Sequence, residues 1–502
     1  MTGLPPSLWN EMGESMLNNP IREKLHIGLL CLIASCVLLL LCSQCSPLYP
    51  INVWGDANCL LTVGRVMKEG GVVYRDIYEQ KGPTLYLIHA IAACISDNSF
   101  FGVYVMEVIS FTAVLFMACR LGMRKRSAWA ASCDAVLFGA CLLAGSAFSR
   151  GDSAEEFCLP YLMGALTLAF RHYGKKSGPM PLKALFACGL MAGMVATIKF
   201  TILGLFVGLC IAEGMLALRE GGMKCAMRSA VAFLAGMLLP IAVWCAYFAA
   251  HGALGDFYTA YIHNNIFLYS DETRTILDAA HDIWDTVRDN ALWVLLCCTG
   301  FAAFMLDRRE KLQLRLAALS MAVCAFAAVY FLGRTWPYSP LVLGVFGFAL
   351  FPSAVSWMDR MKRAVARYAL GVITCALALA VAALLSPNAY LRGVPLGDLA
   401  QARLAGYVHE GATLLQYSHL DDGLYLVADR LPQQKYFVRL NVNYDEMYAE
   451  LDRYVKEAIP DYVLTAWVPL PEEFDQYRLI ATDAGYDDRD RINKLLYLYR
   501  RK

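Results

Sequence analysis

The first candidate for chemistry is Asp56, which lies in a polar segment that runs over residues 46–81. It follows Trp54-Gly55 and precedes apolar residues spaced as on one face of a helix, at Leu60, Leu61, Val63 and Val66. A carboxylate within hydrogen-bond reach of an attacking hydroxyl group can take its proton. Asp56 is therefore either a catalytic base or the N-cap of a helix predicted over residues 56–69, lying on a membrane surface.

The end of the same segment concentrates polar and aromatic side chains. Six of its last eight positions are Tyr74, Arg75, Asp76, Tyr78, Glu79 and Lys81. Arg75 and Lys81 could bind a phosphate, or they could simply extend to lipid headgroups. Asp76 and Glu79 could orient these cations or hold a divalent ion.

Two cations elsewhere in the chain are also candidates for a phosphate. Lys199 interrupts a long apolar stretch, with no other charged residue between Lys183 and Glu213. An ionisable residue in such a stretch is a functional candidate by default, although it could be a turn residue whose side chain extends to water. Arg334 lies a few residues before Tyr338, which is either a sugar contact or an interfacial aromatic residue.

Further polar residues fit contacts with a sugar or a metal. Glu155 and Glu156 open an apolar run, where they could bind a ligand or simply stabilise a helix N-terminus. His263 and Asn264 lie among tyrosines in the loop 251–290. Amides beside aromatic rings suit carbohydrate, while a lone histidine is more often structural.

These candidates are embedded in a strongly apolar chain. Of its 502 residues, 58% are hydrophobic and 17% are charged, where soluble proteins have about 25% charged. This composition excludes a disordered chain and argues against a single soluble globule. The net charge of +1 gives no reason to expect nucleic acid as a partner. The 18 cysteines lie mostly inside apolar runs, so neither a disulfide framework nor a zinc site is predicted.

Charge divides the chain into two parts. Before Pro387, 55 of 386 residues are charged, and from Pro387 onward 32 of 116 are charged. We therefore predict an α-helical membrane domain over residues 1–386 and a soluble domain over residues 387–502. Eleven apolar runs approach the length of about 20 residues that a span requires. They are 25–45, 100–121, 127–147, 154–171, 182–198, 200–218, 229–250, 291–307, 314–332, 338–358 and 366–386.

The distribution of Lys and Arg predicts the orientation of these spans. Basic residues concentrate in alternate loops, near 22–24, 124–126, 171–176, 219–228, 308–315 and 360–367. These loops are assigned to the cytoplasm, which places the N-terminus inside. The first outer loop, 46–82, and the C-terminal domain are then outside. The apolar segment 83–97 is too short for a span and should be an interfacial or half-inserted helix that begins at Pro83.

The C-terminal part reads as a small layered α/β domain. Strands are predicted over 424–428, 436–440, 461–467 and 494–499, with an amphipathic helix over 444–459. It contains no catalytic motif that we recognise. It could recognise an acceptor, cover the outer cavity, or serve stability alone.

The first outer loop resembles that of the GT-C superfamily of membrane glycosyltransferases. The similar branch contains protein O-mannosyltransferases and lipid A aminoarabinose transferases, of glycosyltransferase families 39 and 83. The matching residues are Asp56, the segment Gly71-Val72-Val73-Tyr74-Arg75-Asp76 and the segment Lys81-Gly82-Pro83-Thr84-Leu85-Tyr86. Two positions depart from the family: its second acid is Ala57 here, and the Glu before its Lys motif is Gln80, with Glu79 displaced by one. That Glu helps hold a metal in some members, so a divalent metal ion stays open as a cofactor.

The resemblance implies an inverting glycosyltransferase. It would move a hexosyl or pentosyl unit from a polyprenyl-phosphate-linked donor to a glycan, lipid or protein acceptor at the outer face of the cell membrane. Asp56 would be the catalytic base, and Lys81, Lys199, Arg334 and Arg75 would bind the donor phosphate. The alternative is a polytopic transporter or a flippase for lipid-linked sugars, which also has many spans and intramembrane charge. Against it, no inverted repeat is visible, and the polar candidates gather on one side of the predicted membrane.

Overall fold

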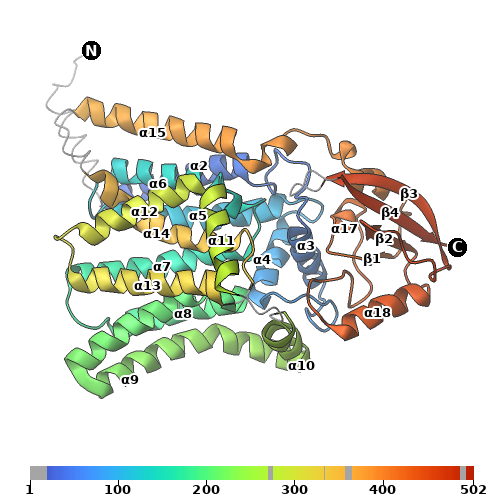
Figure 1. Cartoon of the computed structure of the whole chain (residues 1–502), viewed down its shortest axis with the longest axis horizontal. Coiled ribbons are helices and arrows are strands. Elements are labelled where there is room, and N and C mark those ends of the chain that lie inside the picture. The colour runs from blue at the N-terminus through green and yellow to red at the C-terminus, as the bar shows by residue number, and fades with distance from the viewer. Residues whose placement is uncertain (1–19, 270–274, 333, 357–363, 487–492) are drawn as a thin grey trace, which may run out of the picture.

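The computed structural model describes residues 20–269, 275–332, 334–356, 364–486 and 493–502. It has two parts, a bundle of long helices and a smaller part with a β-sheet, which lie at opposite ends of the molecule (Figure 1). The apolar first three quarters of the chain build the bundle, and the charged last quarter builds the sheet-containing part.

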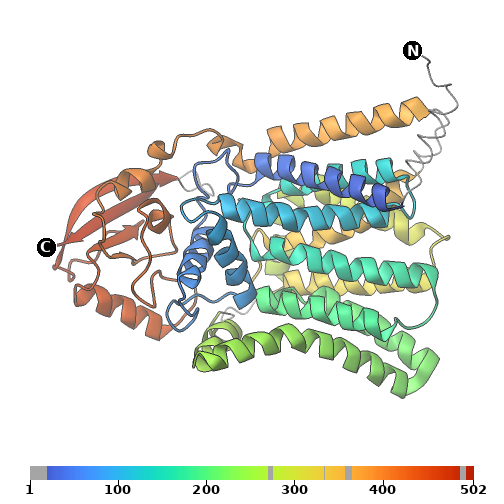
Figure 2. The same ribbon diagram turned by 180° about the vertical axis from the view of Figure 1, so that it is seen from behind.

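The predicted apolar runs form the bundle. In the described part of the chain, each of the eleven runs overlaps one of the bundle helices. These are α2 (Pro20–Cys42), α5 (Phe101–Gly122), α6 (Ala128–Leu143), α7 (Ala154–Lys175), α8 (Leu182–Lys199), α9 (Gly204–Ala250), α12 (Ala291–Leu306), α13 (Leu312–Phe331), α14 (Gly344–Val355) and α15 (Ala364–Leu385). The runs 200–218 and 229–250 are the two arms of α9, which folds back at Gly222, where φ is 66°. The first and last of these helices, α2 and α15, lie beside each other in both views (Figure 1, Figure 2).

The eleven predicted spans do not all correspond to helices long enough to cross a membrane. Among the described residues, six helices are long and apolar enough to cross a membrane, or up to seven if α11 (Ile276–Asp289) and α12, bent by 102°, form one span. The apolar helix α6 and the segment 339–355 are shorter. The prediction of a polytopic helical membrane protein is confirmed, whereas the count of eleven spans is not established.

Close helix packing depends on glycine at the contact between α8 and α9. A Cβ atom on Gly189 would lie 1.9 Å from the carbonyl oxygen of Phe233, and one on Gly236 would lie 2.1 Å from that of Phe186. Small residues let helix backbones approach closely, which is how apolar helices associate when burial of apolar surface cannot drive them together. The glycines therefore fix the separation of these two helices.

The basic loops gather at the end of the bundle that is remote from the sheet. Arg124 pairs with Glu310 at 2.9 Å, and Lys125 pairs with Asp307 at 2.6 Å. These contacts join the end of α5 to the link between α12 and α13, and the fold-back of α9 lies at the same end (Figure 1). Loops that share the predicted excess of positive charge thus share one end of the molecule.

Shorter elements connect the bundle to the sheet-containing part. They are α3 (Gly55–Lys68), α4 (Pro83–Ile95), η1 (Ser146–Phe148), η2 (Phe200–Ile202), α10 (Leu254–Phe257), the π-helix η3 (Tyr258–Leu268) and η4 (Ser339–Leu343). Two of them match the predicted helices over 56–69 and 83–97, and Pro83 is the first residue of α4, as expected.

The helix α3 does not lie on an open surface, as its amphipathic pattern predicted. Residues Ala57–Arg65 are buried, because the C-terminal part covers the side of α3 that faces away from the bundle. The guanidinium of Arg65 donates to the carbonyl oxygens of Tyr425 and Arg430 and pairs with Asp429 at 2.8 Å. The polar face that a surface helix would turn to water is here turned to protein.

The C-terminal part forms a four-stranded sheet within the described residues. The strands are β1 (Leu414–Gln416), β2 (Tyr462–Ala466), β3 (Tyr477–Tyr486) and β4 (Asn493–Arg501), in the order β1-β2-β4-β3. β1 is parallel to β2, and β4 is antiparallel to both of its neighbours. The remaining helices of this part are η6 (Pro387–Leu391), η7 (Leu396–Asp398), α16 (Ala400–Ala405), α17 (Leu424–Val427) and α18 (Asp445–Lys456). The predicted strands over 461–467 and 494–499 and the predicted helix over 444–459 are confirmed.

Two predicted strands are wrong. Residues 424–428 form the short helix α17, which starts after Gly423 at φ 88°, and the carbonyl of Tyr425 is satisfied by Arg65 of α3 instead of a neighbouring strand. Residues 436–440 form no strand, although all of them except Arg439 are buried, and the carbonyl of Phe437 accepts from the backbone amide of Gln416. Burial alone produced the apolar pattern of these two segments.

Candidate active site

Asp56 lies in the first turn of α3, at the junction of the two parts of the molecule. Trp54 occupies the N-cap position, so the structure does not support a capping role for Asp56. The hydroxyl of Tyr338, just before η4, donates to Oδ2 of Asp56 at 3.2 Å. The ammonium of Lys81 lies 3.6 Å from Oδ1, and the Asp56 side chain keeps 14% of its surface exposed. The carboxylate is thus held from two sides and remains accessible.

Lys81 is positioned by the backbone of the residue that follows it. The amide of Gly82 donates to the carbonyl of Ile198 at 3.0 Å, at the end of α8. A Cβ atom on Gly82 would lie 2.1 Å from the carbonyl oxygen of Thr197, so only glycine allows this approach. The contact joins the loop that carries Lys81 to the helix that ends in Lys199.

The ammonium of Lys81 is shared between two carboxylates. It lies 3.3 Å from Glu79 and 3.6 Å from Asp56. Glu79 is buried and also accepts from the Lys81 backbone amide at 2.9 Å and from the hydroxyl of Tyr86. Burial opposes the charge on Lys81, but the two carboxylates outweigh it and hold the pKa of Lys81 above its usual range. Lys81 is therefore a permanent positive charge beside Asp56.

Lys199 reaches the same group of residues from the end of α8. Its ammonium donates to Oε1 of Glu155, in the first turn of α7, at 2.6 Å. It also lies 5.4 Å from the centre of the Tyr338 ring, close enough for a cation–π contact. Tyr338 therefore connects Lys199 to Asp56.

An aromatic cluster forms one side of the site. The rings of Trp336 and Tyr338 are stacked at 6.3 Å, and the ring of Trp54 lies 5.0 Å from that of Tyr338. The indole of Trp336 donates to the hydroxyl of Tyr269 at 2.7 Å, and the guanidinium of Arg334 packs 4.9 Å from the Trp336 ring. Arg334 is thereby placed at the outer edge of the cluster.

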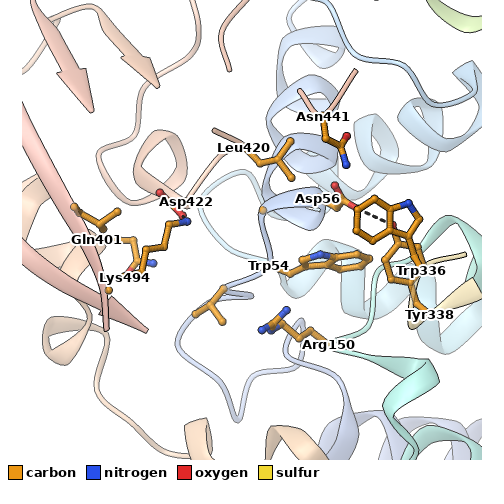
Figure 3. Close-up of a pocket in the computed structure, with 14 residues that line it drawn as sticks. Trp54, Asp56, Arg150, Trp336, Tyr338, Gln401, Leu420, Asp422, Asn441 and Lys494 are labelled. Atoms are coloured by element: carbon orange, nitrogen blue, oxygen red, sulfur yellow. Dashed lines mark hydrogen bonds and ion pairs between the residues drawn. The ribbon is translucent and has the colours of Figure 1, made fainter. Parts of the chain in front are cut away.

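A cavity of about 190 Å³ opens beside Asp56, between the bundle and the C-terminal part (Figure 3). Its wall on the bundle side contains Asp56, Arg150 and the rings of Trp54, Trp336 and Tyr338. Its opposite wall contains Gln401, Asp422 and Lys494 of the C-terminal part, and Asn441 and Leu420 complete the lining near α3. Lys81, Lys199 and Arg334 are not among the described residues that line this cavity, but each contacts one that is.

Arg150 is a cation of the site that the sequence did not single out. It lies between η1 and α7 in a turn where Ser149 and Asp152 have φ values of 57° and 65°. Non-glycine residues in this left-handed region are uncommon and cluster at functional sites. The carbonyl of Arg150 accepts from the backbone amide of Gln44 at 2.9 Å, which anchors the turn. The sequence signal was the run Ser-Arg-Gly-Asp, although backbone strain cannot be read from it.

Four of the sequence candidates have their recorded contacts elsewhere. Arg75 pairs with Asp76 at 2.7 Å and donates to the carbonyl of His251, near the surface. His263 contacts its neighbour Asn264 at 3.1 Å, and the amide of Asn264 donates to the hydroxyl of Tyr78. These contacts brace the segment that leads to Lys81 without reaching Asp56.

The buried acids behind the site include the last candidate, Glu156. Its Oε2 accepts from the backbone amide of Asp152 at 3.0 Å, and Asp152 bonds the ring of His89 at 2.7 Å. Among the described residues, no group of three or more His, Cys, Asp or Glu side chains is arranged to hold a metal ion. The acids of the site are instead engaged with lysine, histidine and backbone amides.

The geometry suits proton transfer beside a charged leaving group. One accessible carboxylate faces a cavity, where it can accept a proton from a hydroxyl. The ammonium of Lys81 and the hydroxyl of Tyr338 lie within 4 Å of Asp56, in a partly buried environment where charge interactions are stronger than in water. Such a site can activate a hydroxyl nucleophile and stabilise a departing phosphate.

Comparison with known proteins finds similarity of fold only. The chain is similar to the crystal structure of ArnT from Cupriavidus metallidurans in the apo state, with a TM-score of 0.60, 12% identity, and coverage of 94% of this chain and 97% of ArnT. The same ArnT bound to undecaprenyl phosphate gives a TM-score of 0.61 and 13% identity, with the same coverage. No protein-family model matches the sequence, and no curated protein matches it either. The likeness extends over both parts of the molecule.

Proposed function

We propose that this chain, which has the fold of the GT-C membrane glycosyltransferases, moves a sugar from a polyprenyl-phosphate-linked donor to an acceptor hydroxyl. The observation that carries the proposal is the accessible carboxylate of Asp56, held between Lys81 and Tyr338 at the edge of a cavity. The undecaprenyl phosphate bound to ArnT supports a donor of the same lipid class.

In the proposed reaction Asp56 is the base. The acceptor oxygen forms a bond to the anomeric carbon of the sugar, the bond from that carbon to the phosphate oxygen breaks, and the acceptor proton passes to Asp56. A single carboxylate in this position fits one displacement, and therefore inversion at the anomeric carbon, as the resemblance implies. The phosphate leaves with the bonding electron pair and needs cations that strengthen their hold as charge develops.

Lys199, Arg334 and Arg150 are the proposed phosphate ligands, with Lys81 acting mainly on Asp56. Lys199 and Arg334 flank the aromatic cluster, and Arg150 lines the cavity. Arg75 is a weaker candidate, because it pairs with Asp76 and donates to the carbonyl of His251, away from the cavity. A divalent metal stays an open possibility for which the described residues offer no ligand group.

We further propose that residues 1–386 are the membrane domain and residues 387–502 an extracytoplasmic domain, with the N-terminus in the cytoplasm. Basic residues gather at the end of the bundle remote from Asp56, and the rule that positive loops stay inside then places the active site outside. A transporter is less well supported, since the polar groups described here lie at one end of the bundle instead of near its middle.

The test is transfer by the purified protein, with undecaprenyl-phosphate-linked sugars as donors. We expect sugar transfer or slow hydrolysis by the natural chain, and a loss of about 10²–10⁴-fold in Asp56→Asn with undecaprenyl phosphate binding retained. Asp429→Asn is the control, because Asp429 is an exposed acid that pairs with the other end of α3. Turnover of Asp56→Asn at the natural rate would refute the assignment of the base.

A further inference from the structure

We propose that the C-terminal wall of the cavity binds the carbohydrate portion of the acceptor. This inference rests on the proposed function and deepens it by assigning a substrate class to one wall. The wall consists of Gln401 at the start of α16, Asp422 before α17 and Lys494 in β4, and it faces Asp56 across the cavity (Figure 3).

The charged pair of this wall is fixed in place. Asp422 forms ion pairs with both Lys494 and His419, and its side chain is 6% exposed. Lys494 also lies 5.9 Å from the ring of Trp467. Because its ammonium is already matched by a carboxylate, the wall offers hydrogen-bond donors and acceptors with little net charge. That suits neutral hydroxyl groups better than a phosphate.

Gln401 provides a second and independent observation. It is only 5% exposed, it borders the cavity, and its side-chain amide forms no hydrogen bond with any described residue. A largely buried amide that borders a cavity without a protein partner normally meets water or a ligand there. An amide offers two donors and an acceptor, which is the pattern that sugar hydroxyls require.

The other walls fit the same ligand. The rings of Trp54 and Trp336 provide apolar faces for the C–H groups of a sugar ring. The cations proposed to hold the donor phosphate come from the bundle, around Tyr338, on the opposite side from Gln401. An acceptor hydroxyl bound at the C-terminal wall would therefore approach the anomeric carbon from the side opposite the leaving phosphate, which is the direction that inversion requires.

The inference can be tested by direct binding, without turnover. Saturation-transfer NMR on the purified full-length protein would use methyl α- and β-glycosides of glucose, mannose, galactose and arabinose as probes. The variants are Gln401→Leu and Lys494→Met, with Gln433→Leu as the matched control, since Gln433 is an exposed glutamine of the same part that does not line the cavity. Unfolding temperatures and undecaprenyl phosphate binding verify that each variant is intact.

We expect at least one glycoside to bind to the natural protein. Its affinity should fall about three- to tenfold in Gln401→Leu and in Lys494→Met, because each variant loses one or two hydrogen bonds to the sugar. The affinity should be unchanged in Gln433→Leu. The inference is overturned if no glycoside binds, if the affinity is unchanged in both variants, or if undecaprenyl phosphate binding falls equally. Asp56→Asn should keep glycoside binding. Glycoside binding by a protein that transfers no sugar would refute the proposed function while leaving this site intact.

Discussion

Lys81→Met is expected to slow sugar transfer by about thirtyfold. The ammonium of Lys81 lies 3.6 Å from Asp56, and Coulomb's law gives about 4–5 kcal/mol for unit charges at that separation and an effective dielectric constant of about 20. The cavity admits water beside the pair, and Glu79 shares the ammonium, so we take about half of this value. About 2 kcal/mol corresponds to a roughly thirtyfold change in rate.

The direction of the change follows from the charge that is removed. Without Lys81, Asp56 and Glu79 face each other without a cation between them, so Asp56 is no longer held in place at the edge of the cavity. The assay is sugar transfer by the purified protein at pH 7, with kcat and the KM for donor measured separately. Lys81→Arg keeps the charge and serves as the matched control.

Turnover by Lys81→Met at the natural rate would refute this role for Lys81. A raised KM for donor with an unchanged kcat would assign Lys81 to phosphate binding instead. A loss of protein stability would appear as a lower unfolding temperature, which is measured on the same samples.

Three further predictions follow from the same geometry. Lys199→Ala should raise the KM for donor and lower kcat, each by about tenfold, because a phosphate contact strengthens in the transition state; normal kinetics would move Lys199 to a structural role with Glu155. Single cysteines at Arg309 and Glu457, both exposed, should react with membrane-impermeant reagents from opposite sides of the membrane, with the Glu457 position outside; labelling from one side would overturn the topology. Burial opposes the charge on Asp422, but His419 and Lys494 outweigh it and lower the pKa of Asp422 to about 2. The Asp422 carboxylate therefore stabilises the fold by about 2 kcal/mol at any pH above its unfolded pKa near 4. This stabilisation is lost as the pH falls from about 4 toward 2. Hydrogen exchange in β4 should therefore become faster over that range in the natural chain, and Asp422→Asn should already exchange faster at pH 7; equal protection in both would refute the contribution.

The sequence patterns predicted where the helices lie along the chain better than they predicted what each helix packs against. Hydropathy located the bundle helices and α4, because an apolar run of such length has few other places to fold. It could not show that α3 is enclosed, because the contacts of Arg65 come from residues more than 350 positions away. The same lack of long-range information led to the wrong prediction of a strand over residues 424–428.

The sequence predicts Lys81, Lys199 and Arg334 on one side of the membrane, and in the structure each contacts a residue that lines the cavity beside Asp56. The prediction rests on the expectation that loops on one side of a membrane share a plane, whatever their distance in sequence. It could not find Arg150, whose importance lies in a strained turn, or the wall formed by Gln401, Asp422 and Lys494. No local pattern marks Gln401, Asp422 and Lys494, because they line the same cavity as Asp56 only after the C-terminal part docks.

The enclosure of α3 has a consequence for the order in which the chain is assembled during synthesis. The ribosome completes α3 among its first seventy residues, yet Thr62 and Arg65 find their partners in Asp421, Tyr425 and Arg430. Nearly the whole chain must therefore be made before the helix that carries Asp56 is held on both sides. A chain stopped after the bundle would possess Asp56 and the lysines, but its α3 would lack the partners that the C-terminal part supplies. The wall formed by the bundle is thus made first, and the cavity is closed last.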